Sequence, residues 1–225
     1  MSTEVKICGL CRPSDARLAQ QSGADYLGVV LAPSPRRQEA EAALEIWEGA
    51  EGGRRGRTVR RVGVFVDAAE DGAIDTAARL GLDVLQLHGA ESPELCRRIG
   101  AAGDWRVWKA IHVDRGTDLV REVDRYAGAV DGVLVEGRSD RGKGGVGARF
   151  DWEIAASARQ SWPEGLTLIM AGGLTAGNVS SAVQVVGPDV VDVSSGVERV
   201  LCEKDPEKLR AFIAAVKKTI GRASG

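Results

Sequence analysis

Several features that the sequence lacks limit the class of protein it can encode. No apolar stretch approaches the ~20 residues of a membrane span. The first four residues contain no basic region followed by an apolar run, so we expect no signal peptide. A net charge of -2 gives no general attraction to nucleic acid or to an anionic membrane. The four cysteines do not resemble the disulfide framework of a secreted protein. We therefore expect a cytoplasmic protein with neither a nucleic-acid nor a membrane partner.

What the sequence contains is an alternation of strand-like and helix-like segments over its 225 residues. The predicted strands are 5–8, 26–31, 62–66, 84–87, 106–111, 132–135, 167–170 and 190–193. The predicted helices are 13–22, 39–48, 71–80, 93–101, 117–126, 151–160, 176–185 and 206–220. Eight strands, each followed by a helix, indicate a parallel sheet, and the count and length favour a closed (β/α)₈ TIM barrel formed by residues 1–225 as a single domain. The alternative is an open doubly wound sheet. The biased segment 49–57 is read as a solvated loop rather than an RNA-binding arm.

In such a barrel the functional groups lie where the strands end. Cys8 ends the first strand, and Lys6 lies two residues behind it on the same face. A nearby positive charge helps a thiol to ionise, and the thiolate is the reactive form. The competing interpretation is that Cys8 is simply a small buried apolar residue.

Two glycine-rich turns follow the seventh and eighth strands. They contain Gly172 and Gly173 in the first turn and Ser195 and Gly196 in the second. Glycine lets backbone N–H groups approach an anion closely, and TIM barrels commonly bind phosphate at these two positions. The segment from Ser194 is also expected to begin a short helix. The alternative is that both are ordinary tight loops.

A series of motifs at the strand ends resembles one known family, the phosphoribosylanthranilate isomerases of tryptophan biosynthesis. The motifs are Lys6-Ile7-Cys8-Gly9-Leu10, Ser34-Pro35-Arg36, residues 62–67, Gln86-Leu87-His88-Gly89, Lys109-Ala110, Gly144-Gly145-x-Gly147 with residues 150–152, Ala171-Gly172-Gly173-Leu174 with Asn178-Val179, and residues 192–198. The resemblance implies a (β/α)₈ fold and an Amadori rearrangement without a cofactor. N-(5-phosphoribosyl)anthranilate would become 1-(2-carboxyphenylamino)-1-deoxyribulose 5-phosphate.

The resemblance also implies roles for individual residues. Cys8 would be the general base that removes the C2′ proton, and Arg36 would hold the anthranilate carboxylate. The phosphate would lie on the backbone amides around Gly172, Gly173, Ser195 and Gly196. The family's general acid is an aspartate, but Glu136 stands at that position here. Glu136 is the expected acid, with Asp140 as the alternative, and its pKa would need to be raised for it to act near neutrality.

Other residues carry weaker expectations. His88 and Asp192 are expected to contact the substrate, with a purely structural role as the alternative for each. Asp67 is expected to be structural or to support the residues that contact the substrate. Val146 replaces the threonine usual in the family's glycine-rich loop. We expect a monomer. The rival functions are isomerisation of another phosphorylated aminoaldose and phosphate-ligand binding without turnover.

The four cysteines raise a separate question, because Cys8 and Cys11 have the spacing of redox and zinc sites. We expect no metal site, since His88 and His112 are far apart in the sequence and no second Cys or His pair is close. Reversible oxidation that disables Cys8 is the alternative. Cys96 and Cys202 are expected to be helix-packing residues.

Overall fold

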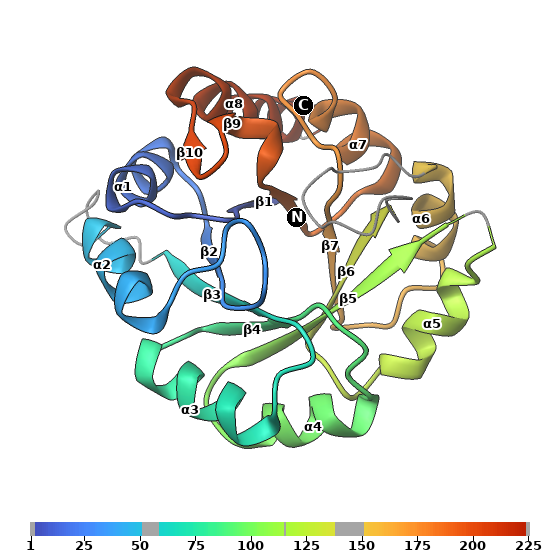
Figure 1. Ribbon diagram of the computed structural model, residues 1–225. Coiled ribbons are helices and arrows are strands. Elements are labelled where there is room, and N and C mark those ends of the chain that lie inside the picture. The colour runs from blue at the N-terminus through green and yellow to red at the C-terminus, as the bar shows by residue number, and fades with distance from the viewer. Residues whose placement is uncertain (1–2, 51–58, 115, 138–150, 224–225) are drawn as a thin grey trace.

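The computed structural model describes residues 3–50, 59–114, 116–137 and 151–223. Its centre is a closed barrel of eight parallel strands in the order β1 to β8, surrounded by helices (Figure 1). The strands are β1 (Glu4–Ile7), β2 (Tyr26–Val30), β3 (Arg60–Phe65), β4 (Val84–Leu87), β5 (Arg106–Val113), β6 (Gly132–Gly137), β7 (Thr167–Met170) and β8 (Val190–Val193). The closed order confirms the predicted barrel and excludes the open doubly wound sheet.

Eight α-helices alternate with these strands in the described part of the chain. They are α1 (Pro13–Ser22), α2 (Ala40–Ala50), α3 (Glu70–Leu80), α4 (Pro93–Ala101), α5 (Leu119–Tyr126), α6 (Trp152–Arg159), α7 (Val179–Val186) and α8 (Pro206–Ala223). Local chemistry explains some of the helix starts. Ser92 Oγ accepts a hydrogen bond from the Leu95 N–H and caps α4, and Asp205 accepts from two N–H groups at the start of α8.

Strand alternation divides the core into two layers. Val5 and Ile7 of β1 belong to the large apolar cluster that includes the buried helix residues. The other strand face belongs to a smaller cluster inside the barrel, where the rings of Tyr26 and Trp108 lie 4.9 Å apart. Lys6 pairs in register with Tyr26, so its side chain also enters the barrel. The strand parity predicted for Lys6 and Cys8 is therefore confirmed.

A short hairpin between β8 and α8 was not predicted. It consists of a 3₁₀ turn, η1 (Ser195–Val197), followed by the antiparallel strands β9 (Glu198–Val200) and β10 (Glu203–Lys204). The helix expected after Ser194 is thus only a three-residue 3₁₀ turn, because the chain becomes extended again at Glu198.

The hairpin also corrects two predictions about cysteine. Cys202 lies in the turn between β9 and β10, not in a helix, and forms a disulfide with Cys11. Cys11 is therefore not available to pair with Cys8, whose thiol is free and buried. Cys96 is a buried residue of α4, which confirms its predicted packing role.

Candidate active site

The carboxyl ends of the strands surround a cavity of ≈ 440 Å³. All nine residues that the sequence predicts for the site line this cavity: Cys8, Arg36, His88, Glu136, Gly172, Gly173, Asp192, Ser195 and Gly196. They come from the ends of β1, β4, β6, β7 and β8 and from the loop after β2. Asp140, Val146 and the loop 142–147 lie outside the described residues, as does most of the segment 49–57.

A buried ion pair lies beside Cys8. Lys6 Nζ is 2.8 Å from Asp192 Oδ2, and Lys6 is fully shielded from solvent. Asp192 Oδ1 has no hydrogen-bond partner among the described residues, although the atom is buried and its side chain lines the cavity. This oxygen therefore keeps an unused capacity to accept a hydrogen bond, and the contact between Asp192 and substrate stays a prediction.

The thiol of Cys8 is less acidic than the sequence indicated. Burial raises the pKa of Cys8, and the charge of Lys6, although it acts in the expected lowering direction, does not compensate. Asp192 neutralises much of that charge and itself opposes ionisation of the thiol. The expectation of a readily ionised thiol is therefore wrong, because the pKa of Cys8 lies above its ordinary value.

Gly28 provides the space for these two side chains, a role that sequence reasoning missed. A Cβ atom at this position would lie 3.0 Å from Cys8 Sγ and 3.1 Å from Lys6 Cε. Gly28 is a glycine in the interior of β2, and a glycine there often marks a close approach by another group. A glycine inside a predicted strand was therefore the feature of the sequence that could have indicated this role.

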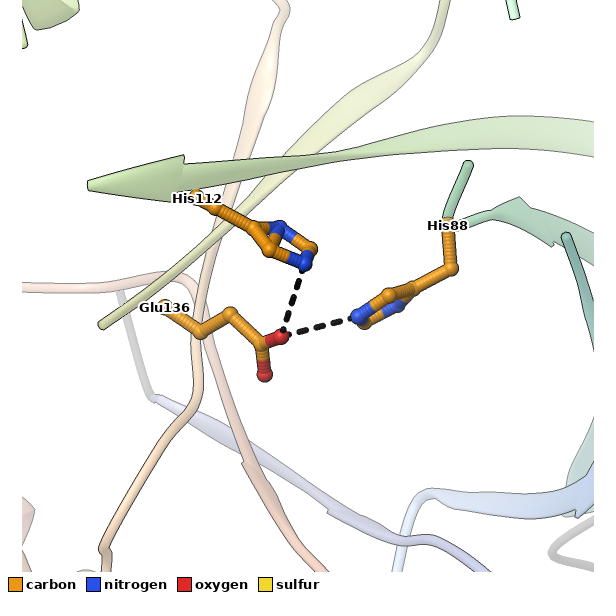
Figure 2. Close-up of side chains that lie close together, drawn as sticks. All are labelled: His88, His112 and Glu136. Carbon is orange, nitrogen blue, oxygen red and sulfur yellow. Dashed lines mark hydrogen bonds and ion pairs between the residues drawn. The ribbon is translucent and has the colours of Figure 1, made fainter. Parts of the chain in front are cut away.

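Glu136 is held by His112 of the neighbouring strand β5 and by His88, which directly follows β4 (Figure 2). Its Oε1 lies 2.9 Å from His88 Nε2 and 3.6 Å from His112 Nε2. Burial raises the pKa of Glu136, but the hydrogen bond and charge of His88, together with His112, outweigh it and lower the pKa below its usual value. The raised pKa required of a lone acid is thus not met. His112 was not predicted as a site residue because β5 extends beyond the expected end at Ile111.

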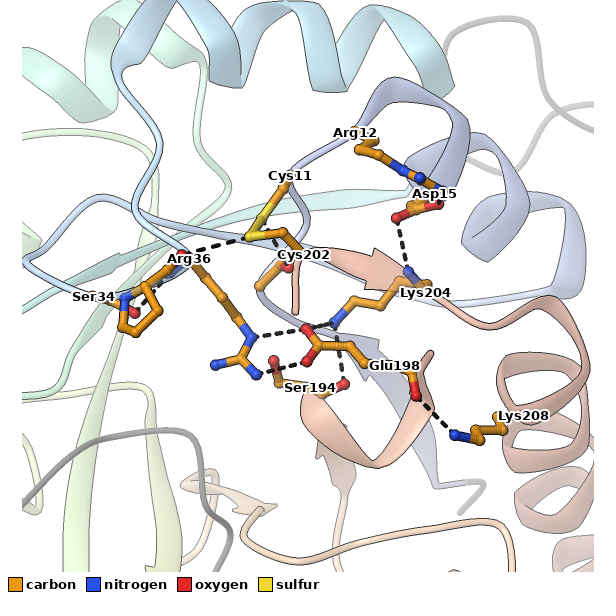
Figure 3. A network of polar contacts seen from close by, with 12 residues as sticks. Cys11, Arg12, Asp15, Ser34, Arg36, Ser194, Glu198, Cys202, Lys204 and Lys208 are labelled. Carbon is orange, nitrogen blue, oxygen red and sulfur yellow. Dashed lines mark hydrogen bonds and ion pairs between the residues drawn. A yellow bond between two sulfur atoms is a disulfide. The ribbon is translucent and has the colours of Figure 1, made fainter. Parts of the chain in front are cut away.

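Arg36 lies in a polar network with Glu198 and Lys204 (Figure 3). Its Nε and Nη2 donate to the two carboxylate oxygens of Glu198 at 2.7 and 2.6 Å. Lys204 Nζ donates to the same carboxylate at 3.1 Å and to the Ser194 carbonyl at 3.1 Å. A guanidinium has five N–H donors, so the remaining donors of Arg36 can meet a ligand carboxylate. Glu198 and Lys204 hold the plane of the guanidinium and were not assigned this role from sequence.

The two glycine-rich turns lie side by side at the cavity wall. Gly172 and Gly173 have φ values of 85° and 64°, which favour glycine and turn the backbone sharply. Gly196 packs so closely on the Leu174 carbonyl that a Cβ atom would overlap it. Backbone from both turns therefore faces the same part of the cavity. Asp67, by contrast, accepts a hydrogen bond from the Ala90 N–H at 2.6 Å and lines a neighbouring cavity, which supports its structural role.

Comparison with known proteins identifies the family. The sequence profile of the N-(5'-phosphoribosyl)anthranilate (PRA) isomerase family matches residues 5–215 of this chain. The chain belongs to this family. A PRA isomerase from Geobacter sp. (strain M21) is 43% identical over 217 residues, which cover 96% of this chain and 98% of the relative. The relative from Syntrophus aciditrophicus is 40% identical over 220 residues, covering 97% and 89%.

Solved PRA isomerase structures share the fold. The Thermotoga maritima enzyme has a TM-score of 0.83 and 35% identity, covering 96% of this chain and 99% of that chain. A PRA isomerase in complex with reduced 1-(o-carboxyphenylamino)-1-deoxyribulose 5-phosphate has a TM-score of 0.80 and 34% identity, with the same coverage. The family resemblance read from the motifs is thereby confirmed.

Proposed function

We propose that this PRA isomerase family member converts N-(5-phosphoribosyl)anthranilate into 1-(2-carboxyphenylamino)-1-deoxyribulose 5-phosphate. The observation that carries the proposal is the shared cavity: a thiol and a carboxylate from β1 and β6 face it together with an arginine and two glycine-rich turns. These groups match the needs of an aminoaldose that carries one carboxylate and one phosphate. The family membership supports the same reaction.

A proton delivered by Glu136, together with its hydrogen-bond partner His88, opens the sugar ring. The ring oxygen receives a proton, the bond from this oxygen to C1′ breaks, and the nitrogen lone pair forms the Schiff base. Because the pKa of Glu136 is lowered, we assign the proton to the hydrogen-bonded pair of Glu136 and His88 rather than to an isolated carboxylic acid. His88 then acts through Glu136, to which it is hydrogen-bonded.

Cys8 acts in the second half of the reaction. Its thiolate removes the C2′ proton, and the electrons of that C–H bond form the enolamine as the Schiff-base nitrogen is neutralised. The enolamine tautomerises to the ketone when C1′ gains a proton and the C2′ hydroxyl loses one. The unpaired Oδ1 of Asp192 is suited to accept a hydrogen bond from the substrate nitrogen.

The remaining groups position the substrate. The Arg36 donors not used by Glu198 would bind the anthranilate carboxylate in a charge-assisted contact. The phosphate would lie on backbone N–H groups around Gly172, Gly173, Ser195 and Gly196, where the two turns meet. No cofactor takes part in these steps.

A steady-state assay tests the function. Freshly generated phosphoribosylanthranilate is mixed with wild-type protein, and the loss of its fluorescence is followed beside Cys8→Ala. We expect turnover by the wild type and loss of turnover in the variant, with both proteins equally folded by circular dichroism. No turnover by folded wild type would overturn the proposal and favour another phosphorylated aminoaldose or a binding role.

Assembly and location remain predictions. One similar structure, from Thermotoga maritima, is described as monomers generated from a dimeric PRA isomerase. We keep the monomer as our prediction for this chain, to be measured by sedimentation. Within the described residues, no helix is long and apolar enough to cross a membrane. The cytoplasmic location is likewise proposed from the biosynthetic character of the family.

A further inference from the structure

Three potential metal ligands meet at the ends of three consecutive strands. His88 follows β4, His112 lies near the end of β5, and Glu136 lies near the end of β6. The parallel register places His112 directly beside Glu136. The Nε2 atoms of both imidazoles point at the same carboxylate oxygen, at 2.9 and 3.6 Å (Figure 2). The three residues are far apart in the sequence, so the cluster becomes visible only in the folded barrel.

The spacing of these atoms suits a small divalent ion. One ligand atom from each residue lies within 4.8 Å of the others. Tetrahedral zinc, with bonds of about 2.0–2.2 Å to nitrogen and oxygen, separates its ligand atoms by roughly 3.3 Å. The observed 2.9 and 3.6 Å fall on either side of that value. All three side chains are partly exposed at the cavity, so small rotations can bring them to ligation distance.

Gln86 supplies a second, independent observation. Its side chain is 2% exposed, and its amide contacts His88 Nδ1 at 3.0 Å through Nε2. Its Oε1 is buried without a hydrogen-bond partner among the described residues. If the amide is turned over when a metal ion binds, Oε1 accepts a hydrogen bond from His88 Nδ1–H and leaves the lone pair of His88 Nε2 for the ion. This is the outer hydrogen bond that metal-binding histidines use to fix their tautomer.

We propose that His88, His112 and Glu136 form a binding site for a divalent transition-metal ion of the zinc class. Three protein ligands leave a fourth position open to the cavity, as in zinc sites that also bind water. Two imidazoles favour zinc, cobalt or nickel over magnesium and calcium, which prefer oxygen ligands. Bound metal inhibits the isomerase because it occupies Glu136 and His88. The inhibition, unlike the metal site itself, rests on the proposed function.

The binding site is tested with Co²⁺ alone, titrated into chelator-treated, dialysed protein and followed by visible absorption. We expect one ion per chain in the wild type and affinity weakened about 10-fold or more in His112→Gln. Glu94→Gln removes an exposed carboxylate of α4 and should bind as the wild type does. Cys8→Ala should also bind normally, since no thiolate is a ligand. Equal affinity in wild type and His112→Gln, or loss of binding in Cys8→Ala, would overturn the site.

The inhibition is tested with Zn²⁺ in the isomerase assay. We expect wild-type turnover to fall as Zn²⁺ rises and to return when EDTA is added. His112→Gln should need about 10-fold or more Zn²⁺ for the same fractional loss. Metal binding without inhibition would overturn the inhibitory role. No wild-type turnover in EDTA would instead overturn the proposed function, and the Co²⁺ titration would still decide the metal site.

Discussion

Lys6 Nζ and Asp192 Oδ2 form a 2.8 Å ion pair inside the barrel. The two residues are register partners on β1 and β8, the strands whose pairing closes the barrel. Their positions set the electrostatic surroundings of Cys8, because Lys6 favours its thiolate and Asp192 opposes it. A buried pair of this kind adds little net stability, but losing one partner leaves the other charged and unpaired.

We therefore expect Lys6→Met to be strongly destabilising. The free energy of unfolding should fall by about 3–5 kcal/mol, because Asp192 is left as an uncompensated buried carboxylate. Urea unfolding followed by circular dichroism measures this change. The double variant Lys6→Met/Asp192→Leu should recover much of the loss, since it removes both charges. A Lys6→Met protein as stable as the wild type would contradict the account.

Gly28 leaves room for the Cys8 thiol, so we expect a larger residue at this position to lower the activity. Gly28→Ala places a methyl group 3.0 Å from Cys8 Sγ, so the thiol must shift by a few tenths of an ångström. We expect kcat/KM to fall about 10-fold, because catalysis is sensitive to small displacements of the base. Gly72→Ala in α3 is the matched control, since nothing lies within 4 Å of its new Cβ. An unaltered kcat/KM in Gly28→Ala would show that Cys8 tolerates the change.

The raised pKa of Cys8 predicts the pH dependence of the reaction. A general base acts in its deprotonated form, so its contribution grows as pH rises toward and through its pKa. Because burial raises that pKa above the ordinary thiol value of about 8.5, kcat/KM should still be rising at that pH. Initial rates at low substrate concentration across the pH range measure the profile. A basic-side plateau reached already at neutral pH would contradict the assignment.

The disulfide between Cys11 and Cys202 predicts a dependence of stability on reduction. It closes a chain segment with a sequence separation of 191 and ties the loop after β1 to the β9–β10 hairpin. Cys11→Ser/Cys202→Ser should lower the free energy of unfolding by about 2–4 kcal/mol under oxidising conditions. With dithiothreitol present, the wild type should become as unstable as this variant. If reductant leaves wild-type unfolding unchanged, the disulfide does not contribute.

Much of the fold follows from apolar periodicity. Strands 84–87, 167–170 and 190–193 have the predicted bounds, as do helices 13–22 and 93–101. The β9–β10 hairpin escaped prediction because its strands are three and two residues long and carry charged side chains. Such short segments contain too few residues for an alternating pattern to be visible.

The sequence predicted which residues line the cavity in part, but not the electrostatics of the site. The motifs placed Cys8, Arg36 and Glu136 at one cavity, and the structure has them there. The lowered pKa of Glu136 comes first from the hydrogen bond and charge of His88 and then from His112, a neighbour that only the register of β5 and β6 reveals. The pairing of Arg36 with Glu198 likewise joins positions separated by 162 residues. Whether burial or a charged neighbour decides the direction of a pKa shift can be determined only from the folded structure.

The most direct test of the account compares kcat/KM for Glu136→Gln and Glu136→Asp with the wild type. Glutamine keeps the size of the side chain but holds no transferable acid proton, whereas aspartate keeps the carboxyl group and is the residue typical of the family. We predict a loss of about 100- to 10,000-fold in Glu136→Gln and a much smaller loss in Glu136→Asp. Near wild-type turnover in Glu136→Gln would contradict the account and move the acid to another residue.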